Sequence, residues 1–461
     1  MARPGIQYGA GRFSSRPDHW AARLGWVRDS SYGSGMSEPY RAGRPGLRSP
    51  PDRSPRDRAE LPPVPRPNTT GWRTPWVWMK TWTFHPHVYP SMIREASPDA
   101  RPGSLVQIYD REGREFGAGL WNPKARVPLR VLYHGADVFG EEDLTALVDR
   151  SLELRLELLR LSAHTEAFRA VHSDADGISG LVVDKFGDTL SVQLHSLGMA
   201  QRFPGWLPRL HERLGTHRCV VEVDPAIARM EGIDMRPLKS DPVRTVKFRE
   251  NGLLYEVDFA SGHKTGFFCD QRDNRRRLAD FSKDKRVLDI CCYTGGFAIA
   301  AKVLGGAKEV VGVDLDEGAI AQARRNANIN GQARIEWVHC DGFSYLRQLR
   351  KNGEKWDVVV LDPPKLVFGR ESEESWGEGL VKYEDLNSLG VVVTAPGGLL
   401  VTCSCSGQLS AEEFERAVTK AAHRVGRKLQ FLDRTGAGAD HPVMSNCSES
   451  RYLKVLWARV W

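Results

Sequence analysis

The sequence predicts an α/β protein whose C-terminal half holds an open, mainly parallel sheet of seven strands. A small β-barrel-like module and an α+β module should precede it. Three observations support this prediction: strands and helices alternate from residue 285 onward, a glycine turn Tyr293-Thr294-Gly295-Gly296-Phe297 joins a strand to a helix, and another strand ends in Asp362-Pro363-Pro364-Lys365. Open α/β sheets bind ligands at the carboxyl ends of their strands, so both motifs should face one crevice.

The strands expected in this sheet are short runs rich in apolar residues. They cover 286–290, 309–314, 334–339, 356–362, 397–402, 427–433 and 451–458, with helices between the first six, for example 317–330 and 410–423. No helix separates the last two strands. They should therefore form a terminal hairpin, with the last strand antiparallel.

The first half of the folded chain has a different pattern. Short strand-like runs between Trp76 and Leu132, separated by turn signals, predict the β-barrel-like module. Leucines at helical spacing predict an amphipathic helix over 141–161. The α+β module should then contain a hairpin over 180–194 with its turn near Phe186-Gly187-Asp188, a helix bearing Trp206, Leu207, Leu210 and Leu214, and a strand at 220–223, before a further strand at 253–259.

The composition excludes several classes of protein. The chain has 461 residues, a hydrophobic fraction of 41% and no apolar run near the ~20 residues of a membrane helix. Its eight cysteines form no CxxC pair, which argues against a disulfide scaffold or a zinc ribbon. We therefore expect a cytoplasmic protein with no membrane partner and no bound metal.

The first 72 residues should be a disordered tail. Residues 1–70 hold eleven of the 27 prolines, twelve Arg, no Lys and six acidic residues, so they carry all but about one unit of the net charge of +7. An organellar transit peptide, an RNA-binding arginine tail and an over-extended start before Met36 are alternatives. We favour a dispensable tail, because mixed charge with many prolines is typical of solvated disorder. Nucleic-acid binding by the remainder must then depend on local patches.

The glycine turn and the next two strand ends suggest a nucleoside-containing cofactor. Gly295 and Gly296 permit close approach to a ligand at a helix N-terminus, and Asp314 ends the next strand, where it could accept hydrogen bonds from ribose hydroxyls. The turn lacks the third glycine that a pyrophosphate requires, which favours S-adenosylmethionine over NAD. Asp341, after the third strand, could accept from an adenine amino group or cap the following helix, and both roles can coexist.

Two further strand ends suggest chemistry on a nucleobase. Asp362 would meet a base flipped into the crevice. Lys365 stands where adenine-N6 and cytosine-N4 methyltransferases have a stacking aromatic residue, which argues against simple amino-group methylation. Methylation at a pyrimidine C5 requires a thiolate that adds to C6, and Cys403 or Cys405 could supply it. The alternative for these cysteines is a place in the core, which we expect for Cys219, Cys291, Cys292 and Cys447.

These residues resemble a known family. Residues 76–461 resemble the large-subunit ribosomal RNA methyltransferase I type, which comprises cytosine-C5 methyltransferases with a PUA domain. The matching stretches are Gly262 to Arg275, Tyr293 to Phe297, Asp362 to Lys365, Ser404-Cys405-Ser406-Gly407, Ala439-Asp440-His441-Pro442-Val443, Asp176 to Leu181 and Asp184 to Gly187. The resemblance implies a PUA-like RNA-binding domain at 73–140, a central α+β domain at 141–250 and a class I (Rossmann-like) methyltransferase domain at 251–461.

The resemblance also implies roles for single residues. Cys405 matches the nucleophile, whereas Cys403 stands where the family usually has another residue. Asp270, Gln271 and Arg272 should border the methionine end of the cofactor, beside Tyr293, Thr294, Gly295, Gly296, Asp314 and Asp341. Catalysis should rest on Cys405 and Asp362. The expected RNA contacts are Lys264, Arg275, Arg276 and Lys365, although the arginines could instead form a solvated helix face.

The function expected from these residues is transfer of a methyl group to C5 of a cytosine in 23S-type ribosomal RNA, through a Cys405 adduct at C6. The partner would be ribosomal RNA or a ribosomal subunit precursor, and a homodimer is possible. Two alternatives stay open. A guanine N2 or N7 methyltransferase would leave Cys405 without a chemical task, and a non-catalytic RNA-binding assembly protein would not need an intact cofactor site.

Overall fold

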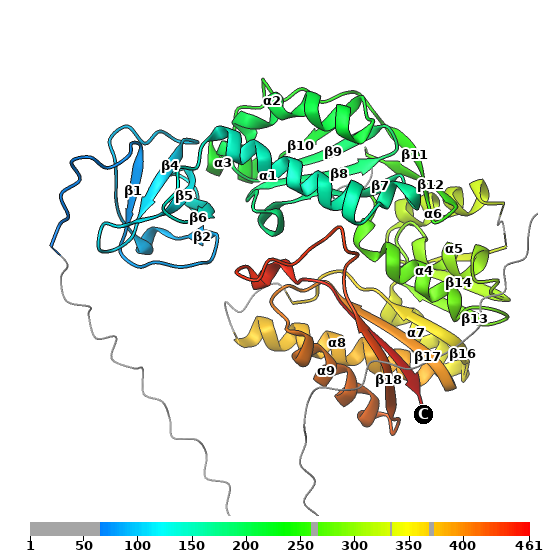
Figure 1. Cartoon of the computed structure of the whole chain (residues 1–461). Helices are drawn as coiled ribbons and strands as arrows, with labels where there is room; N and C mark the ends of the chain where they lie inside the picture. The colour runs from blue at the N-terminus through cyan, green and yellow to red at the C-terminus, as the bar shows by residue number, and fades with distance from the viewer. Residues whose placement is uncertain (1–64, 260–265, 332–333, 368–372) are drawn as a thin grey trace, which may run out of the picture. The chain divides into compact units, whose positions relative to one another are not determined.

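The structure is a computed structural model that describes residues 65–259, 266–331, 334–367 and 373–461. All elements below belong to the unit Val64–Trp461 and are labelled as in Figure 1. The disorder predicted for residues 1–72 concerns a segment of which only 65–72 are described.

The N-terminal module is a six-stranded sheet in the order β2-β6-β5-β4-β1-β3. Its strands are β1 (Trp76–Met79), β2 (His87–Val88), β3 (Ile93–Ala96), β4 (Leu105–Tyr109), β5 (Glu115–Trp121) and β6 (Leu129–His134). A Cβ at Gly117 would lie 2.1 Å from the carbonyl oxygen of Tyr133, and one at Gly119 would lie 2.4 Å from that of Arg130. The glycines in β5 therefore let β6 approach closely. The predicted strand-rich module is confirmed.

The central module combines a four-stranded sheet with three helices. Helix α1 (Glu141–Glu153) continues as a π-helical turn (Leu154–Leu158), within the range predicted for an amphipathic helix. The sheet has the order β10-β9-β8-β7, with β7 (Ala167–His172), β8 (Leu181–Phe186), β9 (Thr189–Leu194) and β10 (Arg218–Glu222). Helices α2 (Leu197–Leu214) and α3 (Pro225–Glu231) complete it, and the predicted hairpin turn at Gly187-Asp188 is confirmed.

A two-stranded hairpin connects the central and C-terminal modules. It consists of β11 (Thr245–Glu250) and β12 (Leu253–Asp258), whose register pairs Glu250 with Leu253. The domain boundary expected after residue 250 falls inside the turn of this hairpin. Both strands belong together, because their side chains share one core with the C-terminal sheet.

The C-terminal sheet has the seven strands that the sequence predicts, in the order β15-β14-β13-β16-β17-β19-β18. They are β13 (Arg286–Ile290), β14 (Glu309–Asp314), β15 (Glu336–His339), β16 (Trp356–Leu361), β17 (Thr394–Ser404), β18 (Leu429–Thr435) and β19 (Lys454–Val460). The first five are parallel, and β19 runs antiparallel to both β17 and β18. The terminal hairpin is thus confirmed, with β19 inserted between β17 and β18.

Helices cover both faces of this sheet (Figure 1). They are η5 (Cys269–Gln271), α4 (Arg272–Asp280), α5 (Gly296–Val303), α6 (Glu317–Ile329), α7 (Gly342–Asn352), α8 (Glu373–Val393) and α9 (Ala411–Arg424). Alternate strand residues separate the two cores: Val287 packs with α4 and α5, and Leu288 packs with α7 and α8. Among the described residues, no helix is both long enough and apolar enough to cross a membrane.

Candidate active site

Four neighbouring parallel strands end at one edge of the sheet, and each carries a predicted site residue there. The glycine turn follows β13, Asp314 is the last residue of β14, Asp362 follows β16 and Cys405 follows β17. In sheet order these strands are β14-β13-β16-β17. The predicted cofactor turn therefore lies between Asp314, expected to bind the ribose, and the two residues expected to catalyse the reaction, Asp362 and Cys405.

Asp314 holds the glycine turn in shape. Its Oδ2 accepts a hydrogen bond from the backbone N–H of Tyr293 at 2.8 Å, and its Oδ1 accepts one from that of Asp316 at 2.9 Å. Tyr293 adopts a left-handed backbone with φ of +47°, which the bond to Asp314 helps to maintain. This structural role accompanies the expected contact with a ribose, because carboxylate oxygens have further acceptor capacity.

The two glycines of the turn serve different purposes. Gly295 has φ of +85°, and a Cβ there would lie 2.5 Å from the ring of Trp337. Gly296 has an ordinary helical backbone as the first residue of α5, but its Cβ would lie 2.7 Å from the side chain of Arg275. Gly295 is thus required by the backbone, whereas Gly296 makes room for an arginine.

Replacing Gly295 by Ala should weaken S-adenosylmethionine binding at least ~10-fold, because a left-handed non-glycine residue costs about 1–2 kcal/mol and Trp337 must also move. Isothermal titration calorimetry measures this loss. Gly306→Ala is the matched control, since Gly306 also has a positive φ (+67°) but its Cβ would meet nothing within 4 Å. Unchanged affinity in Gly295→Ala would show that the turn does not hold the cofactor.

Asp341 is the N-cap of α7. Its Oδ2 accepts hydrogen bonds from the backbone N–H and the hydroxyl of Ser344, both at 2.8 Å. The capping role weighed from the sequence is therefore confirmed. The contact with an adenine amino group stays a prediction, for which the other carboxylate oxygen is available.

Asp362 is the centre of a small polar cluster. Its Oδ2 accepts a hydrogen bond from the side-chain amide of Gln271 at 3.0 Å, and the Cys403 thiol also donates to its carboxyl group. Asp270 lies close enough to repel it electrostatically, and Asp270 itself accepts a 2.5 Å hydrogen bond from the Tyr452 hydroxyl. Residues that the resemblance placed near the cofactor thus contact the residue predicted to meet the base.

The carboxyl group of Asp362 is partly protonated near neutral pH. Burial, together with the nearby Asp270 carboxylate, raises the pKa of Asp362 to about 7. The buried Asp289 on β13 is affected in the same way, and burial and Asp362 raise its pKa to about 8. Such a carboxyl group can donate a hydrogen bond as well as accept one.

This shift predicts a pH-dependent stability. The pKa of Asp362 rises from 3.8 to about 7 on folding, so the native state binds the extra proton and the contribution to stability is lost as the pH rises towards 7. Asp362→Asn should raise the free energy of unfolding at pH 8 by up to about 4 kcal/mol and leave it nearly unchanged at pH 4. Urea unfolding at both pH values measures the difference.

The control for this experiment is Asp280→Asn, because Asp280 is exposed on α4 and, within the described part of the chain, pairs only with Arg276. It should shift the unfolding free energy by less than ~0.5 kcal/mol at either pH. If Asp362→Asn instead destabilised the protein at pH 8, the surroundings of Asp362 would favour its ionised form rather than disfavour it.

Cys403 and Cys405 differ in access although they are two residues apart. Both pack on the core that contains α4 and α5, as their spacing on one strand predicts. Cys403 is completely buried within β17, whereas Cys405 lies just beyond the end of β17 and is only partly buried. Its Sγ lies 4.0 Å from the carbonyl oxygen of Pro363, in the Asp-Pro-Pro-Lys motif. Only Cys405 combines access with a place beside that motif.

One predicted contact needs correction. Arg275, expected to contact RNA phosphate, is buried: it forms a bidentate ion pair with Glu250 at 2.8 and 2.7 Å and stacks over Phe267. Arg272 is also buried, in a bidentate pair with Asp440 at 3.0 and 2.7 Å. A solvated helix face is equally wrong for both arginines. Their partners lie 25 and 168 residues away, so local sequence could not reveal them.

The other basic residues have different surroundings. Arg276 is exposed on α4, in an ion pair with Asp280, and remains available for phosphate. Lys365 is partly exposed. Lys264 lies outside the described residues.

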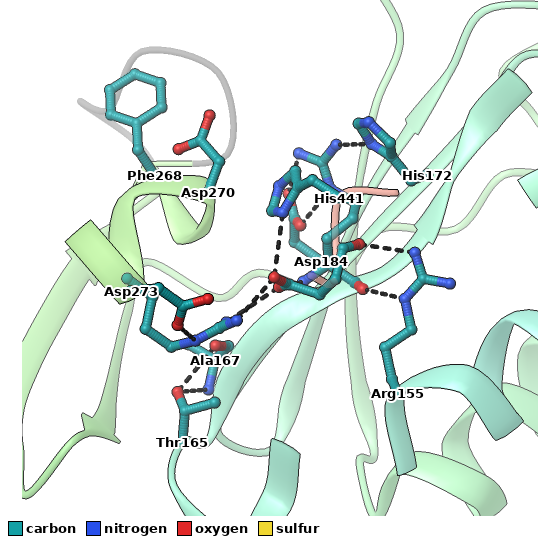
Figure 2. A network of polar contacts seen from close by, with 12 residues as sticks. Arg155, Thr165, Ala167, His172, Asp184, Phe268, Asp270, Asp273 and His441 are labelled. Carbon is teal, nitrogen blue, oxygen red and sulfur yellow. Dashed lines mark hydrogen bonds and ion pairs between the residues drawn. The ribbon is translucent and has the colours of Figure 1, made fainter. Parts of the chain in front are cut away.

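Asp440 joins the central domain to helix α4. Besides binding Arg272, it accepts a 2.9 Å hydrogen bond from the backbone N–H of Arg169, and its carbonyl oxygen accepts one from Arg155 at 2.7 Å. Arg169 in turn pairs with Asp184. Figure 2 shows this network, in which the ring of His172, from the central domain, lies 5.0 Å from the ring of His441, from the C-terminal domain. The resemblance identified residues 439–443 as a motif, and the network gives them a physical role.

The donors and acceptors fit S-adenosylmethionine. Among the described residues, Asp270 Oδ1 is buried and accepts no hydrogen bond. Buried carboxylate oxygens are normally paired, so this atom fits a ligand that brings N–H donors, as the amino group of a methionine moiety does. At the neighbouring strand ends, Asp314 offers carboxylate acceptors to a ligand, and the turn at Gly295 allows a ligand to approach the backbone closely.

Comparisons with known proteins agree with this site. Residues 231–453 match a family profile of S-adenosylmethionine-dependent methyltransferases, and residues 80–134 match one of PUA-like domains. A proposed methyltransferase crystallised in complex with S-adenosylhomocysteine has the same fold, with a TM-score of 0.66 at 21% identity over 78% of this chain and 92% of the other. The sequence predicted a PUA-like sheet, a central sheet and a class I sheet. The match shows that this combination of sheets is a known fold.

Curated relatives extend over most of the chain. "Ribosomal RNA large subunit methyltransferase I" of Tolumonas auensis is 34% identical over 81% of this chain and 95% of its own length. The protein of the same name from Erwinia tasmaniensis is 30% identical over 82% and 95%. With the strand-end site described above, these matches show that the chain is an S-adenosylmethionine-dependent methyltransferase and belongs to the ribosomal RNA large subunit methyltransferase I family.

Proposed function

We propose that this enzyme methylates C5 of a cytosine in large-subunit ribosomal RNA through a covalent Cys405 adduct. The observation that carries the proposal is the place of the Cys405 thiol, partly exposed at the end of β17 and 4.0 Å from the Pro363 carbonyl. Methylation of a guanine nitrogen needs no thiol there, whereas C5 methylation does. The relatives named above act on ribosomal RNA of the large subunit by their names, which supports the choice of RNA.

Cys405 begins the reaction as a thiolate. Its sulfur forms a bond to C6 of the cytosine, and the electron pair of the C5–C6 double bond moves onto the ring, making C5 nucleophilic. S-adenosylmethionine supplies the methyl group that C5 accepts. Loss of the C5 proton to a base then restores the double bond, breaks the bond between C6 and sulfur, and regenerates the Cys405 thiolate.

Asp362 stabilises the charge that this addition places on the ring. Cytosine N3 is a hydrogen-bond acceptor, so a protonated carboxyl group is the appropriate partner. Burial and Asp270 raise the pKa of Asp362 to about 7, which keeps a useful fraction protonated near neutral pH. Gln271 and Cys403 hold the carboxyl group in place by donating hydrogen bonds to it. The orientation of the carboxyl is therefore set before the base arrives.

The remaining predicted contacts complete the proposal. Asp270, Gln271, Asp314, Asp341 and the Tyr293–Gly296 turn would hold the cofactor; Arg272 would act indirectly, by fastening η5 and α4 to Asp440. Arg276, Lys365 and Lys264 would contact RNA phosphates, and the PUA-like domain would bind structured RNA by its shape.

The test is the chemical identity of the product. Purified enzyme, S-adenosylmethionine with a labelled methyl group and large-subunit ribosomal RNA from cells lacking the enzyme should yield labelled 5-methylcytidine after nuclease digestion and mass spectrometry. Labelled N2- or 7-methylguanosine would replace this proposal by the guanine alternative. RNA binding without any labelled nucleoside, together with undetectable cofactor binding, would instead indicate an assembly protein.

A further inference from the structure

Two large aromatic side chains lie exposed on the loop between β1 and β2 of the PUA-like domain. Trp82 and Phe84 are each 57% exposed, and their ring centroids are 5.4 Å apart in an edge-to-face arrangement. Phe116 of β5 and His134 of β6 are partly buried beside them, with their ring centroids 6.2 and 5.3 Å from that of Phe84. We call these four residues the aromatic patch.

The packing of the domain does not account for the two exposed rings. Among the described residues, the core of this sheet consists of side chains such as Val77, Ile108 and Val131, and neither Trp82 nor Phe84 belongs to it. Exposed apolar surface is unfavourable in water, and contiguous patches of it mark binding sites. Because the two rings meet edge to face, at least one of them keeps both its faces clear of the other. A flat partner can therefore lie against the patch.

The chain around the patch is basic. Between Pro65 and Arg94 it has four Arg or Lys residues and no Asp or Glu, and two of the four pair with acids that lie outside this stretch. Lys80, two residues before Trp82, is exposed and forms no ion pair with any described residue. Exposed rings beside positive charge fit a nucleic acid, whose bases offer flat π faces and whose phosphates are negative.

The patch lies beside the loop that reaches the candidate nucleophile. Asn446, in the loop before β19, donates a hydrogen bond from its side-chain amide to the Phe84 carbonyl oxygen at 2.6 Å. Three residues further on, the carbonyl oxygen of Glu449 would lie 3.8 Å from a Cβ at Gly407, which is two residues after Cys405. Since only this short loop separates the patch from the segment that bears the thiol, one strand of RNA can contact both.

We propose that the PUA-like domain holds an unpaired nucleobase of the substrate RNA by stacking it on Trp82 and Phe84. Bases inside an A-form helix are stacked on one another, so a nucleotide in a loop, a bulge or an end is the one that can offer its face. The site therefore selects RNA in which an unpaired nucleotide flanks the target base. This inference rests on the proposed function for the choice of ribosomal RNA, but stacking does not depend on which atom of the target is methylated.

Cross-linking of the wild-type protein is the first test. The enzyme is bound to large-subunit ribosomal RNA from cells that lack it, irradiated with short-wave ultraviolet light, and digested with nuclease and trypsin. Trypsin cleaves after Lys80 and Arg94, so the loop with both exposed rings is released as the single peptide 81–94. Mass spectrometry should find this peptide with a nucleotide attached. Cross-links confined to other peptides would overturn the inference.

The second test compares RNA affinities by filter binding. Replacing both Trp82 and Phe84 by Leu keeps apolar side chains and removes the rings, which should raise the dissociation constant for the same RNA by roughly 5–100-fold. The dependence of affinity on salt should not change, because stacking releases no counterions. Tyr at both positions retains rings and should restore most of the affinity.

Trp461→Leu is the matched control, because Trp461 is 51% exposed in the C-terminal domain. It should change the dissociation constant by less than ~2-fold, as expected for a surface substitution away from the RNA. Urea unfolding of all variants at pH 7 should match that of wild type, since none of the replaced side chains is buried.

The remaining outcomes separate this inference from the proposed function. If the leucine variant binds RNA as tightly as wild type and only loses self-association in sedimentation velocity, the patch is a contact between two copies and the inference fails. If affinity depends on the rings but the product is a methylguanosine, the stacking site stands and the proposed function fails. Formation of 5-methylcytidine with an affinity independent of the rings removes the stacking site alone.

Discussion

Cys405→Ala should abolish the covalent adduct with 5-fluorocytosine-substituted large-subunit ribosomal RNA, whereas Cys403→Ala should retain it. Fluorine at C5 cannot leave as a proton does, so the enzyme stays bound through the sulfur–C6 bond and migrates as a cross-linked species in denaturing gels. Cys405 is partly exposed beside Pro363, and Cys403 is 0% exposed inside β17. On the proposed mechanism, this difference in access decides which of the two cysteines reacts.

Cys403→Ala should nevertheless slow adduct formation by roughly 3–10-fold. It removes one hydrogen bond to the Asp362 carboxyl group, and a hydrogen bond of this kind contributes about 0.5–1.5 kcal/mol. RNA with ordinary cytosine is the control and should give no stable cross-link. A cross-link that persists in Cys405→Ala but disappears in Cys403→Ala would reverse the assignment of the nucleophile.

The second large effect is expected in the buried charge network of Figure 2. Arg272→Met should lower the free energy of unfolding by about 3–5 kcal/mol, because it leaves the buried carboxylate of Asp440 without its bidentate partner. Although burial opposes ionisation, His441 and Arg272 hold the pKa of Asp440 well below its usual value. Removing one partner therefore strands a charge rather than a neutral group.

Arg276→Met is the matched control, since Arg276 lies one helical turn further along α4 and forms an exposed pair with Asp280. It should cost no more than ~0.5 kcal/mol. Urea unfolding at pH 7 in the absence of cofactor compares the two variants. Equal stabilities would mean that the Asp440 network does not support α4, and the indirect role given to Arg272 would fail with it.

The strands and the order of the motifs could be predicted because their signals are local. Alternating apolar runs identified all seven strands of the C-terminal sheet, and Val287 and Leu288 indeed face opposite cores. A turn such as Tyr293 to Phe297 is recognisable because only glycine tolerates the backbone that Gly295 adopts. The missing helix before the last strand likewise indicated the β18–β19 hairpin.

Partners distant in sequence were beyond such reasoning. Arg275 was among the RNA contacts expected from the sequence, but it forms a buried ion pair with Glu250. Lys454 gave no signal, because its hydrogen bond to the Ser406 carbonyl results from the insertion of β19 beside β17. The protonation of Asp362 depends on Asp270 and on burial, and neither can be read from the residues that flank it.

The sequence by itself determined the class of sheet, the cofactor turn and the set of strand ends that carry chemistry, because periodicity and turn residues are properties of neighbouring amino acids. Only the tertiary structure decided which arginines are structural, which of two nearby cysteines is accessible and which acids have a raised pKa. Burial and charge pairing join residues far apart in the sequence, such as Arg272 and Asp440 at a separation of 168 positions, and these contacts control ionisation and reactivity.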